Sequence, residues 1–229
     1  MDEFYRMKKL QLSDKIGYAV LSLFVIVGLI SGLTNVDFFE NRFAVEDGIV
    51  EWSTALLLAA SSIYLFSKAY VLARSNAKFW VICTILLGAL FFFGAGEEIS
   101  WGQRIFGIQS SEFFEEHNAQ KETNLHNLVV GETKVNKLIF GQILTAILVI
   151  YLIIIPFVYK KWEWLGKLIK LFAVPLPQWH HTLAFLLLTG LINIIPSSKK
   201  WEVYELGFAL IFFLIFFNPS NQIYQEKKG

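Results

Sequence analysis

The chain alternates between long continuous apolar stretches and shorter polar segments. Six apolar stretches stand out, and they cover residues 16–33, 49–73, 79–96, 138–159, 179–195 and 201–217. Each has about the 17–25 residues that a helix needs to cross the hydrocarbon core of a bilayer. Helices are expected because lipid offers the backbone no hydrogen-bond partners. The pattern therefore predicts an all-α, polytopic transmembrane helix bundle with about six spans, forming one domain over residues 1–229.

The composition agrees with a chain that lies largely in lipid. Hydrophobic residues make up 55% of the chain and charged residues 17%, whereas soluble domains contain about 25% charged residues. The net charge of +1 gives no electrostatic reason to expect a nucleic acid partner. Membrane lipids are the expected partners. The single cysteine, Cys83, excludes an intrachain disulfide and a metal site built from cysteines.

The positions of Lys and Arg predict the orientation of the bundle. Basic residues concentrate before the first span, at 68–78, at 160–170 and at the C-terminus. Positive charge marks cytoplasmic loops, so both termini are expected in the cytoplasm. The segment 160–170 mixes lysines with tryptophan and leucine, which predicts a short helix along the cytoplasmic surface. His180 and His181, at the cytoplasmic start of the fifth span, are interpreted as interfacial residues.

Most acidic residues lie on the opposite, outer side in this topology, and several sit inside or beside the apolar runs. At the start of the second span, the helix dipole accounts for Glu46 and Asp47 as capping residues. Glu51 is one turn further inside, where an ionisable group is costly and needs a partner or a task.

The stretch 94–104, at the outer end of the third span, is the densest in unusual residues. If the helix continues, Glu97, Trp101 and Arg104 share one face and Glu98 points elsewhere. A structural ion pair between a glutamate and Arg104 is the simpler interpretation. Two adjacent carboxylates at a membrane boundary nevertheless favour a functional role.

Two further acidic groups fall on the same side. Glu122 and His126 are four residues apart, which suits metal ligands or an acid–base pair, although loop histidines are often only turn residues. Glu202 and Glu205 share one face at the start of the sixth span, and capping explains Glu202 better than Glu205.

These groups come from different spans but reach the same depth, so we expect them to meet in one outward-facing polar cavity. The candidate catalytic residues are Glu51, Glu97, Glu98 and Arg104. The candidate metal ligands are Glu97, Glu98, Glu122, His126 and Glu205. Carboxylates with imidazole suit a divalent metal such as Zn²⁺ or Mg²⁺, or proton transfer without metal.

Three motifs carry a resemblance to a family. The stretches "EDGIVEW" (46–52), "GAGEEISWGQR" (94–104) and "NLHN" (124–127) are similar to those of an uncharacterised family of bacterial multi-spanning membrane proteins. The resemblance covers most of the chain and implies a multi-pass protein of the bacterial cytoplasmic membrane.

A fainter likeness is to the alkaline ceramidases and related membrane hydrolases, through the "EW" helix and the glycine-containing helix that follows. Their histidine pair spaced HxxxH has no counterpart here, because His180 and His181 are adjacent. The likeness therefore implies a reaction class only.

Three hypotheses about function follow. The first is a membrane-embedded, metal-dependent hydrolase or transferase that acts on a lipid or lipid-linked substrate at the outer face. The second is a transporter or ion-coupled carrier, which would place polar groups and a broken helix near the middle of the bilayer. The third is a non-catalytic accessory or scaffold protein, with Gly28 and Gly32 forming a packing face for a partner.

Overall fold

The computed structural model describes residues 9–74, 78–125, 127–130, 133–134, 143–159 and 161–221. The long helices are α1 (Leu12–Thr34), α3 (Ile49–Ala73), α4 (Lys78–Glu98), α10 (Trp179–Ile192) and α11 (Lys200–Phe217). Shorter helical pieces are α2 (Val36–Phe38), η1 (Phe39–Phe43), η2 (Ser100–Gly102), α5 (Gln103–Phe106), α6 (Glu112–His117), α7 (Leu144–Val149), η4 (Ile150–Ile154), α8 (Ile155–Val158) and α9 (Glu163–Leu171). A two-residue antiparallel pairing joins β1 (Val129–Val130) to β2 (Thr133–Lys134).

Three of these helices, α1, α3 and α4, are long and apolar enough to cross a membrane, and two shorter apolar helices cover 145–158 and 179–192 within the described residues. Apolar side chains also face outward all along the bundle, for example Leu23, Ile63, Leu90 and Leu187. Exposed apolar surface of this extent is typical of a lipid-facing bundle. The predicted all-α fold is confirmed, and so is the presence of several helices long and apolar enough to cross a membrane.

The predicted and observed helices agree closely in position. The stretch predicted at 49–73 is helix α3 over the same residues, and the ends of α1 and α4 differ from prediction by a few residues. The first part of the stretch predicted at 138–159 lies outside the described residues, and its remainder forms α7, η4 and α8 in succession. The short amphipathic helix expected at 160–170 is α9.

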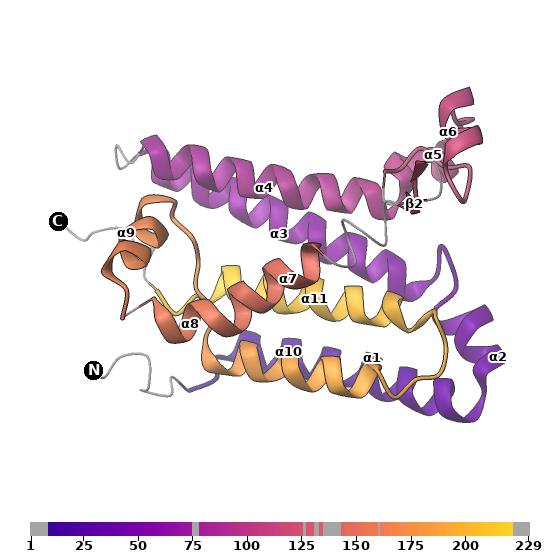
Figure 1. The fold of residues 1–229 in the computed structure, drawn as a ribbon, viewed down its shortest axis with the longest axis horizontal. Helices are drawn as coiled ribbons and strands as arrows, with labels where there is room; N and C mark the ends of the chain where they lie inside the picture. The colour runs from indigo at the N-terminus through magenta and orange to yellow at the C-terminus, as the bar shows by residue number, and fades with distance from the viewer. Residues whose placement is uncertain are drawn as a thin grey trace.

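Helix α11 is the centre of the bundle and packs against α1, α3 and α10 (Figure 1). Its inward side chains, such as Val203, Leu210 and Ile211, belong to the main apolar core. Gly207 allows close approach to α10, because a Cβ at this position would overlap the side chain of Leu188. Close contact through small residues is the usual way in which membrane helices associate.

Glycines of α1 serve the same purpose. Gly28 faces Phe43 and Val203, and Gly32 faces Ile195. This glycine face, which the sequence suggested for a partner protein, therefore packs inside the chain.

The interruption in the helix from α7 to α8 has a local cause. Pro156 has no backbone N–H, so the carbonyl of Leu152 loses its regular helical donor. The chain forms the π-helical turn η4 just before this proline. Thr182 of α10 supplies a replacement donor, because its Oγ1 lies 2.7 Å from the Leu152 carbonyl oxygen.

The described chain begins and ends at the same end of the bundle. Gln11, just before α1, donates a hydrogen bond from Nε2 to Oδ1 of Asn218, just after α11, over 3.0 Å. Helix α9 lies at this end, while α2, α5 and α6 lie at the opposite end (Figure 1). An even number of passages through the bundle is consistent with this arrangement.

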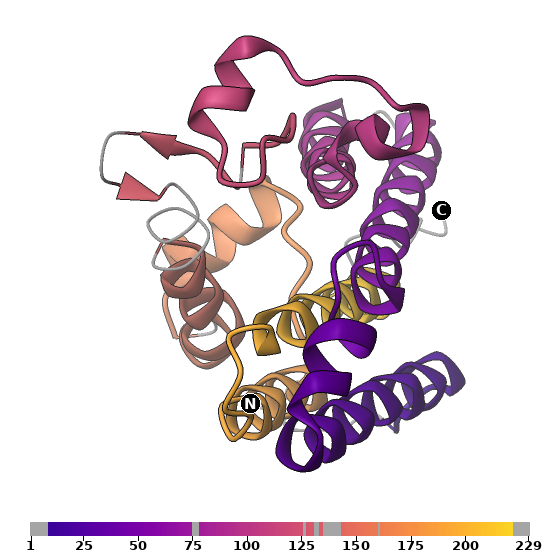
Figure 2. The ribbon, with the colours of Figure 1, turned by 90° about the vertical axis from the view of Figure 1, so that its right-hand side faces the viewer.

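The segment that follows α4 builds the opposite end of the bundle (Figure 2). Ser100, Trp101 and Gly102 have successive φ values of 46°, 54° and 77°, so the chain turns through left-handed conformations. Helix α4 therefore stops at Glu98 instead of continuing to Arg104. This turn redirects the chain, and Arg104 contacts Glu122 and α3 instead of sharing a helix face with Glu97.

Candidate functional site

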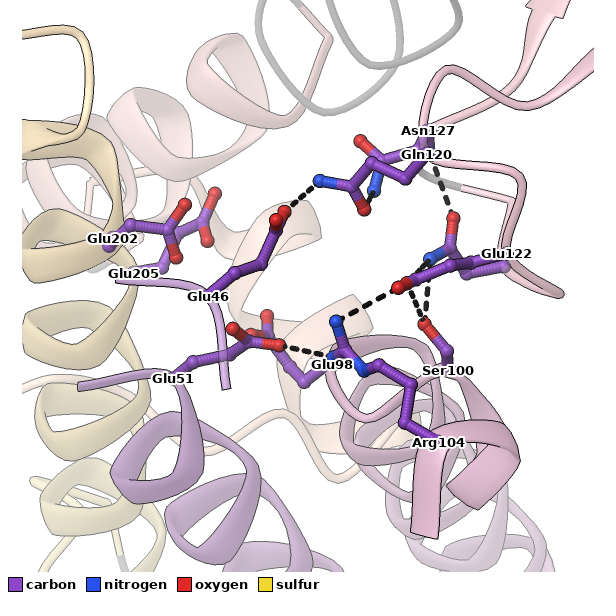
Figure 3. A pocket seen from close by; sticks show the side chains of 11 residues that line it. Glu46, Glu51, Glu98, Ser100, Arg104, Gln120, Glu122, Asn127, Glu202 and Glu205 are labelled. Atoms are coloured by element: carbon purple, nitrogen blue, oxygen red, sulfur yellow. Dashed lines mark hydrogen bonds and ion pairs between the residues drawn. The ribbon is translucent and has the colours of Figure 1, made fainter. Parts of the chain in front are cut away.

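A small polar cavity lies between the ends of α3, α4 and α11 and the loop that follows α6 (Figure 3). Its volume is about 70 Å³, which is room for several water molecules or a small polar group. The lining residues are Glu46, Glu51, Glu98, Ser100, Arg104, Gln120, Glu122, Asn124, Asn127, Glu202 and Glu205. Six carboxylates and one guanidinium give this cavity an excess of negative charge.

Arg104 ties three segments of the chain together. Its Nη2 lies 2.9 Å from Glu51 Oε1 and 3.0 Å from Asp47 Oδ1, and its Nη1 lies 2.9 Å from Glu122 Oε1. Burial lowers the pKa of Arg104, but the carboxylates of Glu122, Glu51 and Asp47 outweigh it, so the pKa is raised and the group stays charged. Its Nε is buried and has no hydrogen-bond partner among the described residues.

Glu51 is held from two sides. Its Oε1 meets Arg104, and its Oε2 accepts a hydrogen bond of 2.7 Å from the backbone N–H of Asp47. Asp47 can donate in this way because its φ of 57° turns the chain back toward the start of α3. The costly position of Glu51 inside the helix is therefore explained by its place beside Arg104.

The loop on the other side of Arg104 is fixed by a network of buried polar groups. Glu122 Oε2 accepts hydrogen bonds from Ser100 Oγ at 2.5 Å and from Asn124 Nδ2 at 3.2 Å. Asn118 Nδ2 in turn donates to both the carbonyl oxygen and Oδ1 of Asn124. Because each of these groups has a partner, the network holds the loop in one arrangement.

The acidic side of the cavity is less well partnered. Glu46 accepts a hydrogen bond from Gln120 Nε2. Within the described part of the chain, neither Glu98 nor Glu205 has a hydrogen bond or an ion pair with a basic residue, and both point toward the cavity (Figure 3). Two carboxylates without such partners beside a half-buried arginine are unusual for a purely structural arrangement.

A second cluster of polar groups lies at the other end of the bundle, where α1 and α10 begin. Asp14, His180 and His181 are 0%, 4% and 0% exposed. One ligand atom from each lies within 4.8 Å of the others, so this group could hold a metal ion. His180 Nε2 and His181 Nε2 each lie 3.9 Å from an oxygen of Asp14. Both nitrogens and Asp14 Oδ1 have no hydrogen-bond partner among the described residues.

Comparisons with known proteins do not assign a role to either site. No family model, no curated protein and no solved structure matches the chain.

The structure places the residues that the sequence singled out as follows. Glu51, Glu98, Arg104, Glu122 and Glu205 line the same cavity.

Glu97 does not line this cavity. It is 4% exposed, and its two oxygens accept hydrogen bonds from Trp101 Nε1 at 2.9 Å and from the backbone N–H of Leu125 at 2.6 Å. It anchors the loop behind the cavity wall. His126 lies outside the described residues.

The sequence did not single out the cluster of Asp14, His180 and His181. The two histidines were interpreted as interfacial, whereas both are buried. An aspartate in the first turn of an apolar helix was a signal, because a carboxylate there needs a partner. The adjacent histidines, predicted at the same side of the membrane, were candidates for that partner.

Proposed function

We propose that the protein is a membrane-embedded hydrolase or transferase that acts on the polar head of a lipid or lipid-linked substrate at the outer face. The observation that carries the proposal is the pair of carboxylates, Glu98 and Glu205, that face the same cavity as Arg104. The proposal includes six membrane crossings with both termini in the cytoplasm.

The topology is supported by the shape of the bundle and by its charge. Within the described residues, three long apolar helices, two shorter ones and α11 form the bundle, and the start of α1 meets the end of α11. Helix α9, with its exposed Trp162 and Trp164, lies at that same end and fits a cytoplasmic interface. The cavity is then at the outer face.

The proposed chemistry follows from which cavity residues are not held by Arg104 and can therefore exchange a proton with a substrate. In the proposed reaction, Glu98 or Glu205 accepts the proton of an attacking water or acceptor hydroxyl. The new bond forms at an acyl or phosphoryl centre, the bond to the leaving oxygen breaks, and the proton passes to that oxygen. The guanidinium of Arg104, which lines the cavity, places positive charge beside the oxygen on which negative charge develops.

The proposal assigns proton transfer, and not metal chemistry, to this cavity. Within the described residues, its carboxylates do not bring three ligand atoms together, whereas Asp14, His180 and His181 at the other end do. Glu122 and Glu51 are engaged by Arg104. Glu98 and Glu205 therefore act here as acid and base.

A cation-coupled carrier is a second candidate, because the cavity has more carboxylates than basic groups. A carrier needs a polar path near the middle of the bilayer. Here the section of α11 beyond Glu205 is apolar and packed, with Leu206, Leu210 and Ile211 buried. We therefore prefer the enzyme.

The test is lipid turnover by the purified protein in vesicles containing phosphatidylethanolamine, phosphatidylglycerol, cardiolipin, diacylglycerol and ceramide, with products identified by mass spectrometry. We expect Glu98→Gln and Glu205→Gln each to lower the rate by about 100-fold or more, because each removes a proton-transfer group. Glu163→Gln is the matched control, because the Glu163 side chain is 90% exposed at the other end of the bundle.

Wild-type protein that turns over none of these lipids would contradict the proposal. So would full activity of both cavity variants.

A further inference from the structure

The second buried cluster has the features of a binding site of its own. Asp14 Oδ2 is satisfied by hydrogen bonds of 2.9 Å from the backbone N–H of Gln11 and from Asn218 Nδ2. Its other oxygen, Oδ1, has no partner among the described residues, and neither do the Nε2 atoms of His180 and His181. One ligand atom from each of the three residues lies within 4.8 Å of the others, and buried polar atoms are normally satisfied.

The charge of this cluster favours a cation as the occupant. Asp14 is fully buried, and no Lys or Arg forms an ion pair with it in the described part of the chain. A buried carboxylate is costly unless a positive charge compensates it. A water molecule could bridge the three atoms but would leave that charge uncompensated, whereas a divalent cation would neutralise it.

The kinds of ligand atom narrow the choice of cation. Two imidazole nitrogens and one carboxylate oxygen suit a borderline ion such as Zn²⁺, whereas Mg²⁺ and Ca²⁺ prefer oxygen ligands throughout. Zinc bound at about 2.0–2.2 Å to each atom holds neighbouring ligands about 3.3 Å apart. His181 Nε2 lies 3.9 Å from Asp14 Oδ1, so this separation would close by about half an ångström, and the three ligand atoms already lie within 4.8 Å of one another.

The surroundings of the histidines support coordination and rank the ligands. Tyr18 Oη lies 2.6 Å from His180 Nδ1. It can accept a hydrogen bond from Nδ1–H, which leaves the Nε2 lone pair free to coordinate a metal. The backbone N–H of Gln178 donates to His181 Nδ1 over 3.0 Å, which leaves the proton of the neutral ring on Nε2. Coordination through His181 Nε2 requires the Gln178–His181 hydrogen bond to break and the ring proton to move to Nδ1, so His181 is the weakest of the three ligands.

We propose that Asp14, His180 and His181 bind one divalent transition-metal ion, represented in the test below by Zn²⁺. The ion acts as a structural clamp, because it holds neighbouring helices together. The ion joins the start of α1 to the start of α10 and, through the bond from Asn218 to Asp14, to the end of α11. This inference is independent of the proposed enzymatic function, because the cluster and the cavity lie at opposite ends of the bundle.

The test is zinc binding by the whole protein after chelator treatment, measured by elemental analysis and by competition with a fluorescent zinc chelator. We expect one Zn²⁺ per wild-type chain. We expect Asp14→Asn and His180→Gln to weaken binding by about 100-fold or more, and His181→Gln to weaken it less. Tyr18→Phe keeps all three ligands and should weaken binding by about 10–100-fold, because it removes only the group that orients His180.

Matched controls are Asp37→Asn and His117→Gln, which change exposed residues elsewhere. Circular dichroism of each variant shows whether the helices remain, and Tyr18→Phe decides the matter if Asp14→Asn does not fold. The proposal is overturned if wild type binds no Zn²⁺, if folded Asp14→Asn binds as tightly as wild type, or if Tyr18→Phe has unchanged affinity.

Discussion

At the scale of single residues, Arg104 determines the arrangement of the cavity. It brings together Asp47 and Glu51 from the start of α3 and Glu122 from the loop. Without a guanidinium at this place, three carboxylates would lie close together with no compensating charge. The single arginine therefore has both a structural and an electrostatic role, and a substitution tests the two together.

Replacing Arg104 by Gln should destabilise the protein by about 3 kcal/mol, because it leaves the buried Glu51 and the half-buried Glu122 without their cationic partner. The measurement is thermal or denaturant unfolding in detergent, with Arg42→Gln as a control at an exposed arginine. Equal stability of the two variants would show that the ion pairs of Arg104 contribute little.

At the scale of elements, close packing of α10 against α11 depends on Gly207. A larger side chain there would overlap Leu188, whereas Gly190 on α10 has no neighbouring atom within 4 Å of the place of a Cβ. The two glycines thus differ in surroundings although both are in apolar helices, and this difference provides a controlled comparison.

We expect Gly207→Val to lower the free energy of unfolding by about 1–3 kcal/mol, because it overpacks the interface with Leu188. Gly190→Val should change it by less than about 1 kcal/mol, since the side chain would enter open space. Unfolding followed by circular dichroism in detergent measures both. An equal effect at the two positions would mean that packing against Leu188 does not set the cost.

The elements also show what can be predicted from the sequence and what cannot. The helix at 49–73 was predictable because a continuous apolar run has clear ends. The end of α4 at Glu98 could not be predicted in this way. It depends on left-handed conformations at Ser100 and Trp101, and neither residue is a glycine.

The same contrast holds for the two sites. The meeting of Glu51, Glu98 and Glu205 follows from topology, because all three lie at helix ends on one side. Asp14 and the two histidines were also predicted on one side of the membrane, but their meeting depends on α1 and α10 becoming neighbours, which that placement alone does not determine.

At the scale of the whole molecule, two polar clusters lie at opposite ends of an apolar bundle. The acidic cavity faces one side, and the buried cluster of Asp14 and the two histidines lies at the other. If the bundle spans a membrane in the proposed orientation, chemistry at the cavity is accessible from outside while the clamp lies near the cytoplasm. This division of the molecule is the central claim, and it depends on the cavity being open to the outer solution.

The most direct test is the reactivity of a cysteine placed in the cavity, in a chain whose native Cys83 has been replaced by Ser. A small, membrane-impermeant, cationic thiol reagent is added to one side of sealed vesicles or to intact cells. We predict that Glu205→Cys reacts with reagent added at the outer face, because the acidic cavity attracts the cation. Leu210→Cys, which replaces a side chain only 5% exposed and further along α11, should not react. Reaction of Glu205→Cys only from the cytoplasmic face, or no faster than that of Leu210→Cys, would contradict the account.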